Sequence, residues 1–271
     1  MERFFQFYIN ASIHVALAVI SLCIVTVQRL NISVEYDLVG FLFFATIVCY
    51  NFVKYGVEAK KYLIVARPAH KPIQIFSFFS FLACSYFFFQ LPTRLWVIIG
   101  ILTLLSAFYA VPLLPRSKNL RSLSGFKIFL VAVVWVGFTV IVPAISNGLG
   151  FSIQVLLLGL QNFILVLILI LPFEIRDLKY DKVELKTLPQ RWGIPKTKRF
   201  GYILVFLFLI LGLLLTNGQW PKMAFYALIS ILLLTVLRRT KYHQSPYFSS
   251  FWVEGIPILW LLLREFCQSV L

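Results

Sequence analysis

Residues 151–171 read FSIQVLLLGLQNFILVLILIL, an apolar stretch of 21 residues without one charged side chain. A helix needs roughly 20 such residues to cross the hydrocarbon core of a bilayer. The rest of the chain has the same character, because 61% of its 271 residues are hydrophobic and 13% are charged, against about 45–50% and about 25% in soluble domains. This composition excludes a cytosolic globular enzyme, a disordered chain and a nucleic-acid-binding module. It predicts an all-α, polytopic membrane protein.

Eight further apolar stretches flank this one, and we interpret residues 1–271 as a single transmembrane domain. Several stretches are shorter than a full span and must extend into their flanking residues. We predict nine transmembrane helices, near residues 7–27, 39–49, 73–89, 95–113, 126–145, 151–171, 201–215, 223–237 and 251–263.

The positions of the 25 Lys and Arg residues test this arrangement. With nine spans, 21 of them lie on the side that holds the N-terminus, and the other side holds only Arg29, Arg94, Lys222 and Arg264. Positive residues gather in cytoplasmic loops. We therefore expect a cytoplasmic N-terminus, an outside C-terminus, and an inner or plasma membrane location with the active face in the cytoplasm. The net charge of +15 then reflects topology and anionic lipids, not nucleic acid.

Four of the ten acidic residues lie within eleven positions just after the sixth stretch: Glu174, Asp177, Asp181 and Glu184. Their spacing of 3, 4 and 3 places them along one stripe of a helix. Because like charges at these spacings repel, a cation must compensate them. Two alternatives stay open. In the first, the interleaved Lys and Arg side chains compensate the negative charges. In the second, a divalent cation such as Mg²⁺ binds one or two carboxylates together with phosphate oxygens and water.

The acid cluster and the string after it carry a family resemblance. Residues 177–181 read DLKYD, and residues 187–193 read TLPQRWG. This pair resembles the second aspartate motif of the UbiA superfamily of intramembrane prenyltransferases, a DxxxD after the sixth span with TLP…G just downstream. Weaker matches are Tyr109-Ala-Val-Pro112 at the end of the fourth stretch and Arg67-Pro68 in the first long inner loop. The resemblance covers most of the chain and implies a nine-helix UbiA-like bundle.

The first aspartate motif of the family, NDxxDxxxD at the end of the second span, is degenerate here. The aligned string is NFVKYGVEA, residues 51–59, in which Asn51 is kept and the three Asp positions hold Phe52, Tyr55 and Ala59. Glu58 lies seven residues after Asn51, on the same helical face about two turns on. Lys54 offers a point charge for a phosphate. Neither residue restores the family's site.

The resemblance implies a transferase that moves a polyprenyl group from its diphosphate to a hydrophobic acceptor, which is aromatic in many members. It assigns catalysis and Mg²⁺ binding to Asp177 and Asp181, with Glu174 and Glu58 as further candidate metal ligands. Candidate substrate contacts are Asn51, Lys54, Tyr55, Arg67, Tyr109, Lys127, Lys186 and Arg191. The expected partners are the diphosphate, the acceptor and membrane lipids, and an oligomer or a protein partner is left open.

Two other hypotheses stay open. Loss of the first motif favours a catalytically inactive UbiA-like protein that binds lipid or serves as a scaffolding subunit, whereas retention of Asp177, Asp181 and the TLP string argues against simple decay. A small transporter is the third hypothesis, with Glu254 in the ninth stretch as its coupling carboxylate, since acidic residues inside spans mark functional sites by default. The simpler role for Glu254 is a hydrogen bond to a neighbouring Ser or Tyr. The sequence contains no inverted repeat or pair of broken spans that would favour transport.

Overall fold

The computed structural model describes residues 2–56, 70–110, 127–181, 185–216, 218–245 and 247–270. In this part of the chain the fold is all-α, as predicted. The elements are α1 (Glu2–Asn10), α2 (Ile13–Leu30), α3 (Tyr36–Asn51), η1 (Phe52–Gly56), α4 (Lys71–Gln90), η3 (Thr93–Leu95), α5 (Trp96–Ala110), α6 (Lys127–Val136), η5 (Gly137–Ile141), α7 (Val142–Ser146), α8 (Ile153–Asp177), α9 (Leu188–Leu214), α10 (Trp220–Arg239), η7 (Phe248–Val253) and α11 (Ile256–Val270).

In the described residues, each of the nine predicted stretches falls mostly in helix. Seven helical segments are long and apolar enough to cross a membrane, namely α2, α3 with η1, α4, α6 through α7, α8, α9 and α10. The fourth stretch overlaps a shorter apolar helix, Thr93–Phe108. The ninth stretch is divided between the π-helix η7 and α11. The chain is thus an integral multi-pass membrane protein, while nine full spans and the orientation of the termini stay predictions.

The first stretch differs from the prediction of one continuous span over residues 7–27. It is broken into α1 and α2 at Ser12, whose φ of 62° lies in the left-handed region. The short helix α1 keeps one buried residue, Ile9, and exposes Phe4 to 82%. Polar residues at Gln6 and Asn10 prevent this segment from serving as the apolar start of a span, so the membrane helix begins only at Ile13.

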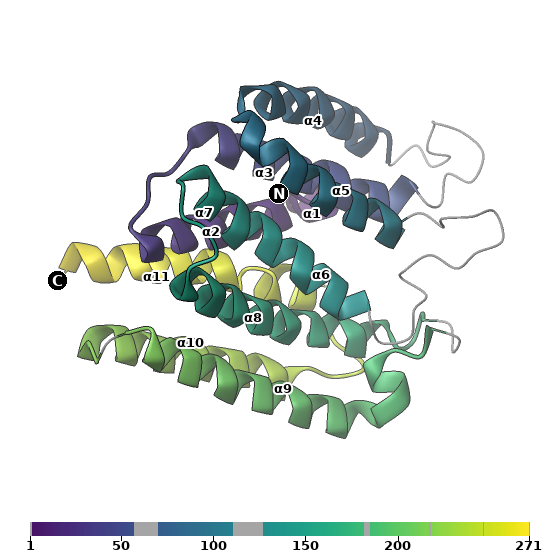
Figure 1. The fold of residues 1–271 in the computed structure, drawn as a ribbon. Helices are drawn as coiled ribbons and strands as arrows, with labels where there is room; N and C mark the ends of the chain where they lie inside the picture. Colours follow the sequence, from purple (N-terminus) through teal and green to yellow (C-terminus); the bar gives the residue numbers. More distant parts are fainter. Residues whose placement is uncertain are drawn as a thin grey trace.

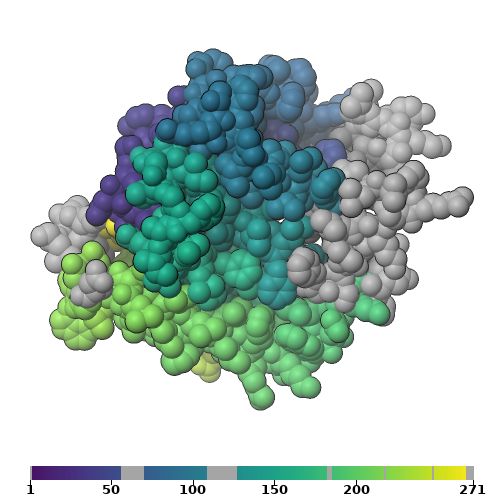
Figure 2. Space-filling model, in the orientation of Figure 1, coloured from purple at the N-terminus to yellow at the C-terminus, as the bar shows by residue number. Residues whose placement is uncertain are grey.

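Among the described residues, the helices pack around three hydrophobic cores that share α2. One core joins α2, α6, α8, α9, α10 and α11 around the fully buried Trp260 and Phe208. Another joins α2 to α3, the segment from η3 through α5, and α7 around Phe41 and Leu95. A third and smaller core joins the end of α2 to η5, α7 and α8. Figure 1 shows α3, α4 and α5 on one side of the central helices, and α9 and α10 side by side on the other. The space-filling view shows the same order, from the blue α3–α5 group to the green α9–α10 pair (Figure 2).

One end of the bundle collects the segments that matter for the site. Helices α3 with η1, α5 and α8 end there, and α4, α6 and α9 begin there (Figure 1). The second aspartate motif and the remnant of the first motif therefore lie at the same end, as the family resemblance implies. Along α4, Phe78, Phe79 and Phe89 are exposed to 59%, 62% and 69%, which suits a helix that faces lipid.

Candidate functional site

The last turn of α8 carries the acid cluster. Glu174 is 5% exposed, and Asp177 ends the helix on the same face. Beyond it, the backbone N–H groups of Tyr180 and Asp181 both donate to the Asp177 carbonyl at 2.8 Å. This turn continues the helical path, so Asp177 and Asp181 keep the i, i+4 relation that the sequence predicted.

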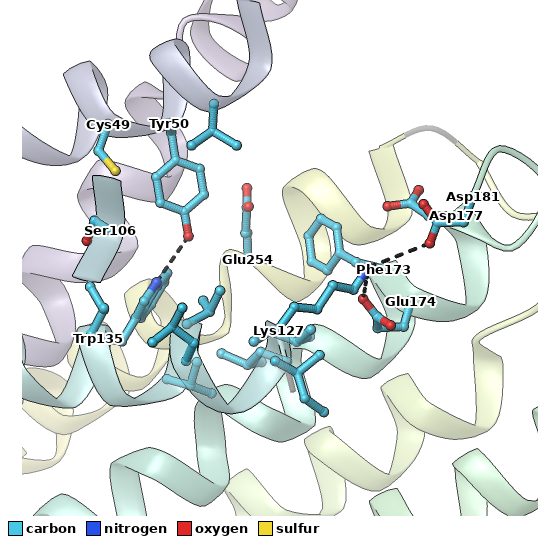
Figure 3. Close-up of a pocket in the computed structure, with 18 residues that line it drawn as sticks. Cys49, Tyr50, Ser106, Lys127, Trp135, Phe173, Glu174, Asp177, Asp181 and Glu254 are labelled. Atoms are coloured by element: carbon cyan, nitrogen blue, oxygen red, sulfur yellow. Dashed lines mark hydrogen bonds and ion pairs between the residues drawn. The ribbon is translucent and has the colours of Figure 1, made fainter. Parts of the chain in front are cut away.

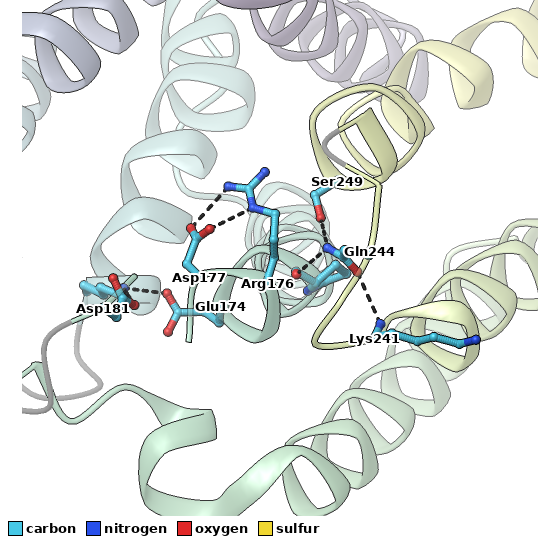
Figure 4. Close-up of polar contacts among 9 residues, drawn as sticks. Glu174, Arg176, Asp177, Asp181, Lys241, Gln244 and Ser249 are labelled. Atoms are coloured by element: carbon cyan, nitrogen blue, oxygen red, sulfur yellow. Dashed lines mark hydrogen bonds and ion pairs between the residues drawn. The ribbon is translucent and has the colours of Figure 1, made fainter. Parts of the chain in front are cut away.

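Two cations compensate these carboxylates. Lys127, the first residue of α6, is 8% exposed and places its Nζ 2.7 Å from Glu174 Oε1 and 3.6 Å from Asp181 Oδ2 (Figure 3). Arg176 forms a bidentate pair with Asp177, with N–O distances of 2.7 and 3.2 Å (Figure 4). Arg176 is one of the interleaved cations that the sequence offered for charge compensation, whereas Lys127 comes from α6 and was not among them. Breaking the buried Lys127–Glu174 pair would cost about 3–5 kcal/mol of stability, because an uncompensated buried charge would remain.

The TLP string fixes the acid cluster to the next helix. Thr187 precedes the first residue of α9, and its backbone N–H donates to the Gln190 side-chain oxygen at 2.9 Å. The Gln190 Nε2 donates in turn to the Asp181 carbonyl at 3.3 Å. Gly193, with a φ of 74°, then permits a kink that a residue with a Cβ would strain. The string acts here on the backbone of Asp181.

A cavity of about 250 Å³ opens in front of the acid cluster. Its charged lining residues, among those the structure describes, are Lys127, Glu174, Asp177, Asp181 and Glu254. The close-up shows the Glu254 carboxylate pointing into this space, between Tyr50 and Phe173 (Figure 3). Carboxylates from two elements far apart in the sequence thus face one cavity, named the polar cavity for these groups although most of its other lining residues are apolar. Glu254 lies in the ninth stretch, where the sequence left its role open.

A second, larger and mostly apolar chamber of about 700 Å³ adjoins the first. It is enclosed by α3, α4, α5 and α6, with aromatic walls that include Phe41, Phe88 and Phe138. The two spaces share the lining residues Cys49, Tyr50, Val53, Ser106, Val134 and Trp135. At this neck the Trp135 Nε1 donates to the Tyr50 hydroxyl at 3.0 Å. Together the two adjoining spaces offer a charged end and an apolar end, within the size range of ligand sites.

The remnant of the first motif lies beside the cavity but serves the fold. Asn51 is 4% exposed, its Oδ1 accepts from the Ser12 hydroxyl at 2.8 Å, and its Nδ2 donates to the Ala11 carbonyl and the Ser77 hydroxyl at 3.1 and 2.8 Å. The Lys54 Nζ donates to the same Ser12 hydroxyl at 3.0 Å, and the Tyr55 hydroxyl donates to the Asn10 carbonyl at 3.1 Å.

These contacts join α3 and η1 to the break between α1 and α2. Neither Asn51 nor Lys54 nor Tyr55 lines either space. Their predicted substrate contacts stay predictions.

The other predicted site residues divide into three groups. Lys127, Glu174, Asp177 and Asp181 come together at the cavity. Lys186 and Arg191 are exposed near the start of α9 and do not line it. Glu58 and Arg67 lie outside the described residues, as does the side chain of Tyr109.

Tyr50 and Trp135 were missed by the sequence analysis. The available signal was an indole N–H in the middle of an apolar stretch, where a buried Trp needs a hydrogen-bond partner.

The acid cluster is the candidate site for a metal ion. Among the described residues, no three His, Cys, Asp or Glu side chains form a group that could hold one. Glu174 Oε2 and Asp181 Oδ2 are nevertheless buried without a hydrogen-bond partner. Such hard oxygen donors suit Mg²⁺ that keeps phosphate and water ligands, not a cage made by protein alone. The residues therefore fit a cation that arrives with a phosphorylated ligand.

Comparison with known proteins decides what this arrangement resembles. No family model and no curated protein sequence matches the chain. The structure is similar to a solved structure of digeranylgeranylglyceryl phosphate synthase in membranes, with a TM-score of 0.58 and 16% identity over 97% of this chain and 98% of that chain. The fold is that of a UbiA-family prenyltransferase. The resemblance inferred from DLKYD and TLPQRWG is thus confirmed at the level of the fold, over nearly the whole length of both chains.

Proposed function

We propose that the chain is a UbiA-like membrane prenyltransferase, which transfers a polyprenyl group from its diphosphate to a hydrophobic acceptor. The observation that carries this proposal is that the two spaces adjoin in this fold. A charged end with Lys127, Asp177 and Asp181 and an apolar chamber share the wall that contains Tyr50 and Trp135. A polyprenyl diphosphate has the matching form, a compact charged head on a long apolar tail.

The head would lie at the charged end. Lys127 contributes a point charge toward the phosphate oxygens, and its pairs with Glu174 and Asp181 hold it in place. Asp177 and Asp181 would hold Mg²⁺ that arrives with the diphosphate, and this ion would supply further charge neutralisation for the leaving group. Lys54 and Arg191 would serve as outer phosphate contacts, as the sequence predicts.

The chemistry is the rupture of the allylic C–O bond and capture of the resulting cation by the acceptor. Charge that develops on the leaving diphosphate is stabilised by the prearranged Lys127 ammonium. Tyr50 and Trp135 line the neck, and their rings would shield the prenyl carbon as it becomes cationic, since aromatic faces attract cations. The apolar chamber excludes water, which would otherwise hydrolyse the intermediate. An inactive lipid-binding scaffold would not require this charged, preorganised end.

We further propose that the site faces the cytoplasm of an inner or plasma membrane and that nine helices span it. The steep Lys and Arg asymmetry supports this orientation.

Binding of geranylgeranyl thiodiphosphate, a donor analogue that reacts slowly, tests the function. The purified protein in lipid nanodiscs is titrated with the analogue in the presence of Mg²⁺ or of a chelator. The Asp177→Asn/Asp181→Asn variant is compared with Asp37→Asn, which removes an exposed carboxylate at the opposite end of α3.

We expect Mg²⁺-dependent binding that the double variant weakens by about 100-fold, since two charge-assisted contacts are lost. The Asp37→Asn variant should bind like the original protein. No binding by the folded original protein, or equal binding by the double variant, would overturn the proposal.

A further inference from the structure

Glu254 is a carboxylate that the proposed donor site does not use. It faces the polar cavity from η7 and α11, opposite the end of α8 that carries Glu174, Asp177 and Asp181 (Figure 3). Among the described residues, none forms a hydrogen bond or an ion pair with its side chain. The simple expectation of a hydrogen bond to a neighbouring Ser or Tyr is therefore not met. Residues next to π-helical segments such as η7 often serve function.

The backbone that carries Glu254 is fixed from two sides. The Gln244 Nε2 donates to the Ser249 hydroxyl at 2.6 Å and to the Pro172 carbonyl at 3.2 Å, which ties η7 to α8 (Figure 4). On the other side, the His14 Nε2 lies 2.9 Å from the Phe251 carbonyl. A carbonyl only accepts, so Nε2 donates, and the His14 Nδ1 accepts from the Tyr8 hydroxyl at 2.7 Å. These contacts hold Glu254 in a fixed place relative to the acid cluster.

The turn after Glu254 is close-packed as well. A Cβ on Gly255 would meet the Phe251 carbonyl oxygen at 2.7 Å and the His14 Nε2 at 3.2 Å. Only glycine lets the chain pass this closely over α2. The position of Glu254 is thus built in by packing and hydrogen bonds.

The charges around Glu254 restrict what it can bind. Lys127 is committed to Glu174 and Asp181, and Arg176 is committed to Asp177. Lys54 and Arg176 interact with Glu254 electrostatically, but neither pairs with it. Four carboxylates thus line the cavity against the single lining cation Lys127, among the residues described. Beside Glu254, the one lining carboxylate among the described residues that no cation pairs with, an acceptor carboxylate would meet a like charge, whereas a hydroxyl group would find an unpaired hydrogen-bond acceptor.

We propose that Glu254 binds the acceptor substrate and takes the proton that it loses, and that this acceptor is a hydroxylated molecule without an acidic group. The inference rests on the proposed prenyl transfer. The allylic C–O bond of the donor breaks and its electron pair leaves on the diphosphate. The acceptor hydroxyl gives its proton to a Glu254 oxygen, and the electron pair freed on the acceptor forms the new bond to the prenyl carbon. Water at the mouth of the cavity then removes the proton from Glu254.

A pair of probes with and without a carboxylate tests this assignment. The protein in nanodiscs is first saturated with geranylgeranyl thiodiphosphate, and this step is recorded separately. It is then titrated with 4-hydroxybenzyl alcohol or with 4-hydroxybenzoate, which share a phenol and differ in charge. The variants are Glu254→Gln, which is isosteric and neutral, Glu254→Asp, which keeps the charge, and Glu2→Gln, an exposed control. Thermal unfolding checks that all of them fold.

The original protein and Glu2→Gln should bind the neutral phenol at least about tenfold more tightly than the carboxylated one, because like charges are excluded. Glu254→Asp should keep most of this preference, and Glu254→Gln should reduce it to less than about threefold. If the donor analogue binds but neither phenol does, or if Glu254→Gln keeps the full preference, the role of Glu254 is overturned and the proposed prenyl transfer is not. Absence of donor binding in the original protein overturns the prenyl transfer and this inference with it.

Discussion

The C-terminal ends of α8 and α3 align with the two aspartate motifs of the family, but their side chains have different roles in this structure. At the end of α8, Glu174, Asp177 and Asp181 face a cavity and are held by Lys127 and Arg176. At the end of α3, the aligned Asn51 is turned into a network that joins α1, α2 and α4. Retention of a motif residue therefore does not by itself indicate retention of its role.

The difference follows from where each side chain finds its partners. Asn51 has both of its N–H groups committed to Ala11 and Ser77, so its amide stabilises the break before α2. Glu174, in contrast, leaves one buried oxygen without a hydrogen bond. Unsatisfied buried oxygens are costly in a structural role and useful in a binding site.

Replacement of Lys127, the buried cation beside the end of α8, should have the largest effect on stability and donor binding. Lys127→Met leaves Glu174 and Asp181 buried without a counterion, which should lower the free energy of unfolding by about 3–5 kcal/mol and abolish donor binding. Calorimetry and titration with geranylgeranyl thiodiphosphate measure the two effects. Lys127→Met/Glu174→Gln should recover much of the stability but none of the binding, and Lys222→Met, at an exposed site, should change neither. Full donor affinity in the double variant would contradict the role assigned to Lys127.

Restoring an aspartate of the first motif should not restore the family's site. Phe52 lines the apolar chamber and not the polar cavity, so Phe52→Asp places a charge where the prenyl chain would lie. We expect donor affinity to fall by about tenfold, because a charge in an apolar site is costly. The control is Phe4→Asp on the exposed face of α1. Tighter Mg²⁺-dependent binding by Phe52→Asp would show that the α3 end still belongs to the donor site.

Removal of the Asn51 amide should affect stability and leave binding nearly intact. Asn51→Leu abolishes three buried hydrogen bonds, which we expect to cost about 1–3 kcal/mol of unfolding free energy. Donor affinity, measured below the unfolding transition, should stay within about twofold of the original. The Asn51→Leu/Ser77→Ala variant should lose less unfolding free energy than the sum of the two single variants, because both changes remove the same Asn51–Ser77 hydrogen bond. A large loss of donor affinity without loss of stability would return Asn51 to the substrate site.

The smallest effect on stability and donor affinity is expected at the neck between the two spaces, where Trp135 and Tyr50 lie. Trp135→Phe removes the N–H that donates to the Tyr50 hydroxyl but keeps an aromatic ring there. We expect the free energy of unfolding to fall by about 1 kcal/mol or less and donor affinity to fall by less than about fivefold. Trp192→Phe, at an exposed site on α9, is the matched control. Complete loss of donor binding in Trp135→Phe would mean that the indole N–H itself contacts the diphosphate.

Much of the architecture could be predicted because apolar runs of span length leave few alternatives. The nine stretches and the grouping of Asp177, Asp181 and Lys127 at one end followed from hydropathy, charge and motif spacing. The start of α9 at Leu188, thirteen residues before the predicted start, was missed because the segment up to Arg199 is strongly basic. The capping pattern of Thr187 and Gln190 was the signal that could have placed it.

Contacts between distant segments could not be predicted in the same way. The pairing of Lys127 with Glu174 joins residues 47 positions apart, and no local pattern records that α6 begins beside the end of α8. Glu254 is a further case, because its place opposite α8 depends on the Gln244 and His14 contacts. Hydropathy identifies which segments are helices, whereas the site depends on which helix ends meet.

The central claim is that one continuous cavity receives a charged head at α8 and an apolar tail between α3, α4 and α5. The most direct measurement is photo-crosslinking with a prenyl diphosphate analogue that carries a benzophenone at the end of its tail, followed by peptide mapping. We predict labels within residues 41–53, 81–89, 99–107 or 134–138, competed by geranylgeranyl thiodiphosphate and lost in Asp177→Asn/Asp181→Asn. Labels confined to the lipid-facing side of α9 and α10, or labels that the competitor does not displace, would contradict the account.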